Sequence, residues 1–185
     1  CITSRRSRAW TDAAFSFEAG EPKMTLCALI VSNGYRDGVI TTIPVRTIAL
    51  FQERDTQIAA GELLGVVLLI AHFGHLLGGP DTIIFGDNMG VIANIVNGAS
   101  RFRDLATITH LLHVRLHELG IKPWWEYVES WSNPSDGGTR AGADDVTAKA
   151  LDICLRTVSP LRLPENFPWL SPTDSSLWSG SEKVL

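Results

Sequence analysis

One glutamate stands alone in a long uncharged stretch of the chain. Glu62 is the one charged residue within positions 57–71, a stretch apolar and long enough for a largely buried helix. Ile58, Ala59 and Val66 lie three or four positions from Glu62, so they share its helical face. A carboxylate on such a face costs several kcal/mol unless a cation meets it. The sequence therefore predicts a cation beside Glu62.

Three further aspartates lie where apolar segments end or loops begin. Asp12 occurs in Ala-Trp-Thr-Asp-Ala-Ala-Phe, Asp87 in Thr-Ile-Ile-Phe-Gly-Asp-Asn, and Asp136 in Asn-Pro-Ser-Asp-Gly-Gly-Thr-Arg. Taken singly, Asp12 fits a strand end or turn, Asp87 a helix cap, and Asp136 a turn. Acids on several apolar elements instead suggest one cluster, with Asp136 as its fourth member. Carboxylate oxygens are ligands for hard divalent cations.

Four carboxylates around two Mg²⁺ ions are the equipment of a two-metal phosphodiester hydrolase. One ion helps to deprotonate the attacking water, and the other stabilises the leaving 3′ oxygen. We therefore expect Asp12, Glu62, Asp87 and Asp136 to be the catalytic metal ligands, with Mn²⁺ as a possible substitute for Mg²⁺.

Composition narrows the class of protein. The chain has 185 residues, 45% hydrophobic and 19% charged, which fits one globular domain. Its net charge of −4 excludes a broad basic surface, so contacts with nucleic acid must be local. Glycine and histidine interrupt the apolar segment 63–77, so we expect no membrane span. Three scattered cysteines and no signal-like segment predict an intracellular protein, in cytoplasm or nucleus, and the start at Cys1 suggests a piece of a longer polypeptide.

The apolar and turn patterns predict an α/β fold with a five-stranded mixed sheet flanked by helices. Three antiparallel strands come first, separated by turns at Asn33-Gly34 and Asp37-Gly38. The expected strands are 8–15, 23–32, 39–45, 82–85 and 122–128, and the expected helices are 53–77, 88–96, 104–119 and 144–155. Residues 8–156 form the predicted domain, and 157–185 are an irregular Pro-, Ser- and Trp-containing tail that either packs on it or serves as a linker.

Four motifs resemble one known family. Thr11-Asp12, Ala60-Gly61-Glu62-Leu63, Phe85-Gly86-Asp87-Asn88 and the segment 131–140 resemble the ribonuclease H domain of retroelement reverse transcriptases, of the LTR/tyrosine-recombinase type. The resemblance runs from about residue 9 to residue 140. It implies the ribonuclease H fold and cleavage of the RNA strand of an RNA–DNA hybrid. It also implies a reverse transcriptase polymerase domain in the same polyprotein.

The chain departs from the family pattern near the fourth acid. Ser135 and Thr139 replace the usual Ala and Ser, and Gly137-Gly138 follows Asp136 directly. Residues 129–135 contain no histidine, and the later helices are not separated by a basic protrusion. An alternative therefore stays open, which is a catalytically inactive ribonuclease H-like domain that binds nucleic acid or braces a polymerase. Integrase-like and exonuclease-like spacings of the acids fit less well.

Other polar residues are candidates for contacts with a hybrid or a metal. Phosphate or 2′-hydroxyl contacts are predicted for Asn88, Arg101, Arg103 and Arg140, against a plain solvated surface for the arginines. His110, His113 and His117 share one side of a helix, and a solvated or backbone-contacting face is favoured there over zinc. Adjacent Trp124 and Trp125 lie in one expected strand, so at least one of them must be buried.

Overall fold

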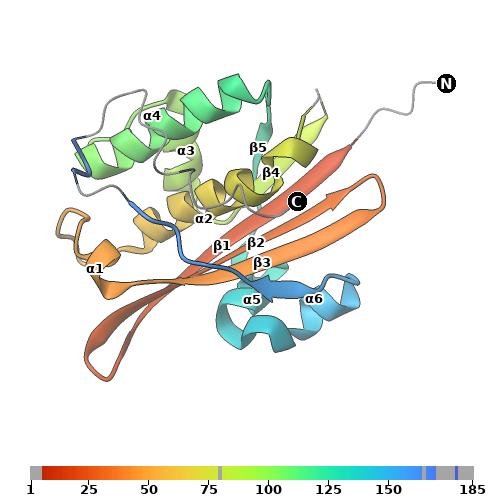
Figure 1. The fold of residues 1–185 in the computed structure, drawn as a ribbon, viewed down its shortest axis with the longest axis horizontal. Helices are drawn as coiled ribbons and strands as arrows, with labels where there is room; N and C mark the ends of the chain where they lie inside the picture. Colours follow the sequence, from red (N-terminus) through yellow and green to blue (C-terminus); the bar gives the residue numbers. More distant parts are fainter. Residues whose placement is uncertain (1–5, 79–80, 164–165, 170–177, 179–185) are drawn as a thin grey trace.

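A six-stranded mixed sheet organises the molecule (Figure 1). The structure, a computed structural model, describes residues 6–78, 81–163, 166–169 and 178. The strand order is β5-β4-β1-β2-β3-β6. The strands are β1 (Ser7–Glu18), β2 (Glu21–Ser32), β3 (Tyr35–Ile43), β4 (Thr82–Gly86), β5 (Trp124–Tyr127) and β6 (Leu155–Thr157).

Helices cover both faces of this sheet. They are α1 (Val45–Ile48), α2 (Ile58–Phe73), α3 (Met89–Asn97), α4 (Arg103–Glu118), α5 (Asp136–Ala141) and α6 (Val146–Ala150), with 3₁₀ turns η1 (Gly74–Leu76), η2 (Ser130–Ser132) and η3 (Gly142–Asp144). Figure 1 shows α2, α3 and α4 on one side of the sheet and α5 and α6 on the other. The main core fills the space between the sheet and the first group.

The predicted mixed sheet is confirmed, with one strand more than expected. β1, β2 and β3 are antiparallel, β4 and β5 run parallel to β1, and β6 runs parallel to β3. The helix predicted over 144–155 is wrong in its extent, because the observed helix α6 ends at Ala150 and Leu155 begins β6. Gly142 and Asp152 have φ values of 64° and 58°, and such left-handed residues end helical segments. The segment therefore breaks into η3, α6 and a strand.

The turn predicted at Asp37-Gly38 is also wrong, because both residues lie within β3. Only Asn33-Gly34, with φ values of 50° and 84°, forms the connection between β2 and β3. A Cβ atom at Gly38 would lie 2.6 Å from Cδ2 of Leu155 and 2.7 Å from Cδ2 of Leu29. This glycine therefore admits neighbouring side chains across the strand and does not turn the chain.

The central helix α2 is buried because it lies on β1 and β2. The stretch Ile58–Leu76 is long and apolar enough to cross a membrane by length and composition, but 72% of it is buried inside the structure. We conclude that it is the core helix of this domain. The described part of the tail packs on the same core, since Leu161, Phe167 and Trp178 are buried there. The domain boundary at residue 156 stays a prediction.

The predicted helix over 53–77 begins later, at Ile58, because the preceding loop is held by a buried ion pair. Arg54 pairs with Asp104, a fully buried residue in the first turn of α4. Oδ2 of Asp104 also accepts a hydrogen bond from the backbone N–H of Gln52, at 2.9 Å. The loop is therefore fixed to the start of α4 rather than extending α2.

We expect Asp104→Ala to lower the free energy of unfolding by about 3–5 kcal/mol, because it leaves the Arg54 guanidinium buried without its partner. Urea denaturation measures the loss. Glu18→Ala, which breaks the exposed pair with Lys23, should leave the free energy of unfolding nearly unchanged. Equal losses in the two variants would contradict a structural role for the buried pair.

Candidate active site

Three acids from three elements converge near the middle of the sheet. Asp12 lies in β1, Glu62 in the first turns of α2, and Asp87 directly after β4. One oxygen from each carboxylate lies within 4.8 Å of one oxygen from each of the others. Asp12 and Glu62 are 3% and 5% exposed, and Asp87 is half-buried. The structure thus brings together three of the four predicted acids.

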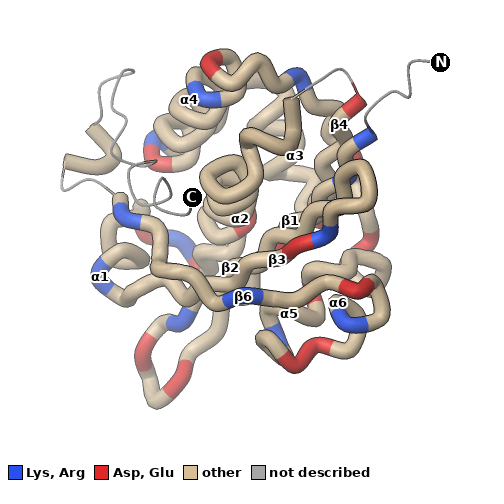
Figure 2. The backbone as a smooth tube through the Cα atoms, turned by 45° about the vertical axis from the view of Figure 1, so that its right-hand side comes forward, with Lys and Arg blue, Asp and Glu red and all other residues tan. Residues whose placement is uncertain are grey.

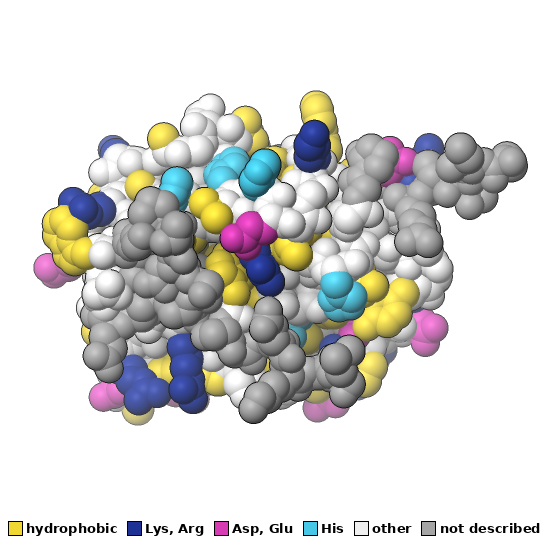
Figure 3. All heavy atoms as spheres, turned by 45° about the horizontal axis from the view of Figure 1, so that its top comes forward, with side chains coloured by type: hydrophobic (Ala, Val, Ile, Leu, Met, Phe, Trp, Pro, Cys, Tyr) yellow, Lys and Arg dark blue, Asp and Glu magenta, His cyan; other side chains and the backbone are white. Residues whose placement is uncertain are grey.

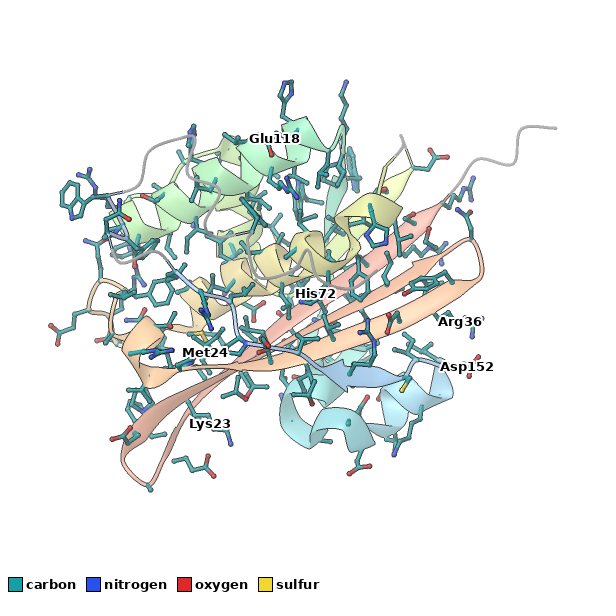
Figure 4. The ribbon with its side chains drawn as sticks, viewed as in Figure 1. Lys23, Met24, Arg36, His72, Glu118 and Asp152 are labelled. Atoms are coloured by element: carbon teal, nitrogen blue, oxygen red, sulfur yellow. The ribbon has the colours of Figure 1, made fainter. Side chains whose placement is uncertain are left out.

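Glu62 reaches β1 because two nearby residues of α2, Gly61 and Gly65, have no side chains that would hold the helix away from the strand. A Cβ atom at Gly61 would lie 2.9 Å from Cβ of Ala13, and one at Gly65 would lie 3.4 Å from the carbonyl oxygen of Asp12. Met24 of β2 lies under the same part of α2, 3.3 Å from the Gly61 Cβ position (Figure 4). At this approach, Oε1 of Glu62 accepts a hydrogen bond from the backbone N–H of Ala13, at 3.3 Å.

Strand register places Asp87 beside Asp12. Trp10 of β1 is paired with Phe85 of β4 in parallel, and each aspartate follows two residues later. The helix cap considered for Asp87 is instead made by Asn88, whose Oδ1 accepts from the backbone N–H of Val91 at 3.1 Å. The Asp87 carboxylate therefore belongs to the group of acids, while the amide oxygen of Asn88 caps α3.

The fourth acid lies outside the group of three. Asp136 is the first residue of α5, and its Oδ1 pairs with the guanidinium of Arg140 at 2.8 Å. Its charge still raises the pKa of Asp12 and of Glu62, so it lies within electrostatic reach of both. The arginine predicted to contact a phosphate is thus the ion-pair partner of the acid predicted to hold a metal.

Three polar residues of the segment before and within α5 connect it to the acid group, and no role was predicted for them. The Thr139 hydroxyl hydrogen-bonds Oδ2 of Asp12. Nδ2 of Asn133 donates to the carbonyl oxygen of Thr11 at 3.0 Å, and its Oδ1 accepts from the Ser135 hydroxyl at 2.6 Å. An Asn two residues before a Ser is a pattern of local turns, and that signal was available in the sequence.

The double glycine after Asp136 allows α5 to pack closely. A Cβ atom at Gly137 would lie 2.1 Å from Oδ1 of Asp145, which is buried and caps α6. A Cβ atom at Gly138 would lie 2.5 Å from Sγ of Cys27 on β2. Glycine at position 138 therefore lets α5 pack on β2, and glycine at position 137 makes room for the Asp145 carboxylate.

Burial and mutual repulsion hold the two innermost carboxyls partly protonated. Burial, followed by the charges of Asp12 and Asp87, raises the pKa of Glu62 to about 9. Burial raises the pKa of Asp12 to about 7, against the Thr139 hydrogen bond, which lowers it. The charge of Arg140, which pairs with Asp136, also lowers the pKa of Asp12, but it is the smallest of the causes. When these protons are released, the three carboxylates offer oxygen donors that fit a hard divalent cation.

Comparison with solved structures identifies the fold. LC9-RNase H1, described as a type 1 RNase H with the type 2 active-site motif, superposes with a TM-score of 0.52 at 12% identity, covering 84% of this chain and 89% of its own. The fold is that of ribonuclease H. RNase H1 from the halophilic archaeon Halobacterium salinarum NRC-1 matches at 20% identity over 70% of this chain and 90% of its own, with a TM-score of 0.43.

LC11-RNase H1, solved in complex with an RNA/DNA hybrid, matches at 9% identity over 69% of this chain and 88% of its own, with a TM-score of 0.48. These last two superpositions add nothing to the assignment of the fold. No protein-family model matches the sequence, and no curated protein matches it.

On this ribonuclease H fold, the other predicted contacts are dispersed. The Arg101 guanidinium lies 4.8 Å from the centroid of the Phe102 ring, and that of Arg103 lies 3.3 Å from the centroid of Trp169. Figure 2 shows Lys and Arg interspersed with Asp and Glu along the chain, consistent with the absence of a broad basic face among the described residues. Hybrid contacts by these arginines stay predictions.

The histidines of α4 do not form a metal site. Nε2 of His113 lies 2.7 Å from the carbonyl oxygen of Ile95, while His110 and His117 are exposed. Figure 3 shows histidine side chains spread over this side of the molecule. Across the residues that the structure describes, the acids at the centre of the sheet form the one group able to hold a metal.

We expect Gly138→Ala to lower the free energy of unfolding by about 1–3 kcal/mol, because its methyl group would overlap Sγ of Cys27. Cys27→Ala in the same chain removes that sulfur and should recover part of the loss. Thermal denaturation of the single and double variants measures both effects. If the losses of stability in the two single variants simply add in the double variant, the contact with the Cys27 sulfur is not the reason that position 138 requires glycine.

In metal-free protein, stability should fall as pH rises. Both folded pKa values lie above the ordinary values of 3.8 and 4.5, so the folded state keeps protons that the unfolded chain has released. The loss runs from about pH 4 to 7 for Asp12 and from about pH 4.5 to 9 for Glu62, at roughly 1 kcal/mol per pH unit for each group.

Urea denaturation in EDTA across this range measures the slope. Glu62→Gln should flatten it between about pH 7 and 9, and Mg²⁺ should restore stability at the alkaline end. Glu118→Gln, at an exposed acid of α4, serves as the matched control. A slope unchanged in Glu62→Gln would contradict the raised pKa of Glu62.

Proposed function

We propose that this chain is a metal-dependent endonuclease that hydrolyses the RNA strand of RNA–DNA hybrids. The observation that carries the proposal is the group of Asp12, Glu62 and Asp87, with oxygens within 4.8 Å and two of the carboxyls buried. Packing gives no reason to bury such charges beside one another, since the arrangement destabilises the folded chain unless a cation is bound. The motif resemblance supplies the substrate class.

In this proposal each acid has a defined task. Asp12, Glu62 and Asp87 supply the oxygen ligands, and Asp136 joins them by leaving Arg140. Bound Mg²⁺, as two ions or with Mn²⁺ in its place, supplies activation of a water and neutralisation of charge at the phosphate. The Thr139 hydroxyl and the backbone N–H of Ala13 orient Asp12 and Glu62, so that their remaining oxygens face the site.

Recognition of the hybrid is proposed to run through backbone and 2′-hydroxyl contacts. If Asp136 turns to bind a metal, its ion pair with Arg140 breaks. The Arg140 guanidinium can then bind a phosphate. Asn88 lies next to Asp87 and can offer its amide nitrogen while its oxygen caps α3. Arg101 and Arg103, at the start of α4, are proposed as more distant phosphate contacts.

We propose further that the domain works within a retroelement reverse transcriptase, next to a polymerase domain. The motifs over residues 9–140 support this context. Sequencing the coding region on both sides of the chain tests it. A reading frame that contains no polymerase motifs on either side would contradict the proposal.

A second candidate is an inactive domain that binds nucleic acid or braces a polymerase. The ion pair between Asp136 and Arg140 favours it, because this pair holds the fourth acid away from the other three. The double glycine no longer does, since Gly137 and Gly138 are required for the packing of α5. Retention of two buried acids without cationic partners favours the enzyme.

The purified chain should nick the RNA strand of a labelled RNA–DNA hybrid with Mg²⁺ and leave single-stranded RNA and duplex DNA intact. Asp87→Asn should lower the rate by about a hundredfold or more, because it removes one ligand charge. EDTA should abolish cleavage.

Asp152→Asn is the matched control, since Asp152 is an exposed acid near α6 (Figure 4) and should leave the rate unchanged. Folded protein that fails to cleave with either Mg²⁺ or Mn²⁺ would establish the inactive binding domain instead.

A further inference from the structure

An open pocket lies on the sheet beside the candidate metal site. It has a volume of about 490 Å³ and is formed at the start of β1, β4 and β5. We call it the β4–β5 pocket, and its lining includes two cations, Arg6 and Arg8, two acids, Asp81 and Glu126, and the rings of Phe85 and Trp124. Trp124 is 66% exposed there, whereas the adjacent Trp125 packs on the other face against the core. Trp125 is half-buried, so the predicted burial of one tryptophan is met only in part, and Trp124 is exposed.

This pocket continues the surface that carries the acids. Alternation along β1 places Arg8, Trp10 and Asp12 on one face. Trp10 packs against the cluster under α6, and Asp12 hydrogen-bonds Thr139 of α5, which fixes that face. At about 3.3 Å per residue, Arg8 lies roughly 13 Å from Asp12 along the strand.

An aromatic pair bridges the interval. The rings of Trp10 and Phe85 are stacked, with centroids 5.4 Å apart and planes 12° apart. Phe85 also lines the pocket, so the path from the acids to the pocket is continuous. A nucleic-acid strand cleaved at the acids would reach this pocket within a few nucleotides.

The side chains of the pocket suit an unpaired nucleotide. Nε1 of Trp124 donates to Oε2 of Glu126 at 3.0 Å, which holds the indole in place and occupies that carboxylate. Arg6 and Arg8 are exposed and form no ion pair within the described ranges. An exposed, oriented aromatic ring next to two available guanidinium groups is the arrangement by which proteins stack single bases and hold their phosphates.

We propose that the β4–β5 pocket binds an unpaired nucleotide extending from the hybrid, with its base on Trp124 and its phosphates at Arg6 and Arg8. The proposal rests on the proposed function for the position of the hybrid. A base inside a duplex is stacked on both faces and cannot lie on Trp124, so the pocket favours a nucleotide that extends beyond the duplex. The proposed occupant is nucleic acid, and the alternative is that a partner protein binds to the same surface.

Binding by the wild-type chain in EDTA tests the proposal without cleavage. Fluorescence anisotropy compares a blunt RNA–DNA hybrid with hybrids that carry a few unpaired nucleotides on the RNA or the DNA strand, at either end. We expect one extended form to bind about fivefold or more tightly than the blunt form, the range that stacking of one base supplies. Trp124→Ala should abolish this preference, and Trp124→Phe should retain part of it.

Phe17→Ala is the matched control, since Phe17 is 68% exposed on the far β1–β2 turn and should leave the preference intact. Arg8→Ala should weaken binding of the extended form and reduce its salt slope by about one unit, whereas exposed Arg46→Ala should not.

Two outcomes overturn the inference: equal binding of all extended and blunt hybrids, or equal losses for both forms in Trp124→Ala. A preference for extended ends in a chain that never cleaves would overturn only the nuclease. Cleavage without any such preference would overturn only the pocket.

Discussion

The close contact of α2 with β1 is the constraint on which the rest of the molecule depends. Gly61 and Gly65 leave no side chain between helix and strand, so the helix lies directly on the backbone near Asp12. This contact buries Glu62 at the centre of the protein and brings it to Asp12. A Cβ atom at Gly61 would lie 2.9 Å from Cβ of Ala13, so a larger residue there would push the helix away from β1 and separate the two carboxylates. The two glycines therefore set both how closely α2 packs on β1 and how close the carboxylates of Asp12 and Glu62 lie.

On the opposite face of the sheet, glycines allow close packing of α5 in the same way. Gly138 admits Cys27, and Gly137 admits the buried carboxylate of Asp145, so a very short helix is held firmly against the sheet. That position presents Thr139 to Asp12 and leaves Asp136 at the rim with Arg140. The acids are thus clamped from two sides by glycine-lined contacts. The grouping of three acids and the separate ion pair of the fourth follow from where each acid lies relative to these contacts.

Much of this arrangement could be predicted from the sequence, because apolar runs and turn residues mark elements locally. The isolated charge of Glu62 pointed to its burial, and the strand before Asp87 was short and wholly apolar. Side-chain pairing in space carries no such local mark. Asp136 and Arg140 have the i,i+4 spacing of a helical ion pair, but no helix was predicted at this position, so the pairing was missed. The wrong extent of the helix predicted over 144–155 has a similar cause, since β6 forms only because β3 offers it a partner far away in the chain.

That last pairing has a consequence for how the protein is made. β6 joins β3 with Gly38 opposite Leu155, a separation of more than a hundred residues in the chain. Until the segment 155–157 leaves the ribosome, the outer edge of β3 exposes unpaired N–H and C=O groups, which can pair with strands of other chains. The domain therefore completes its sheet only late in synthesis. A nascent or truncated chain that ends before β6 would expose the unpaired edge of β3. Its aggregation during expression would therefore indicate that the final strand has not formed.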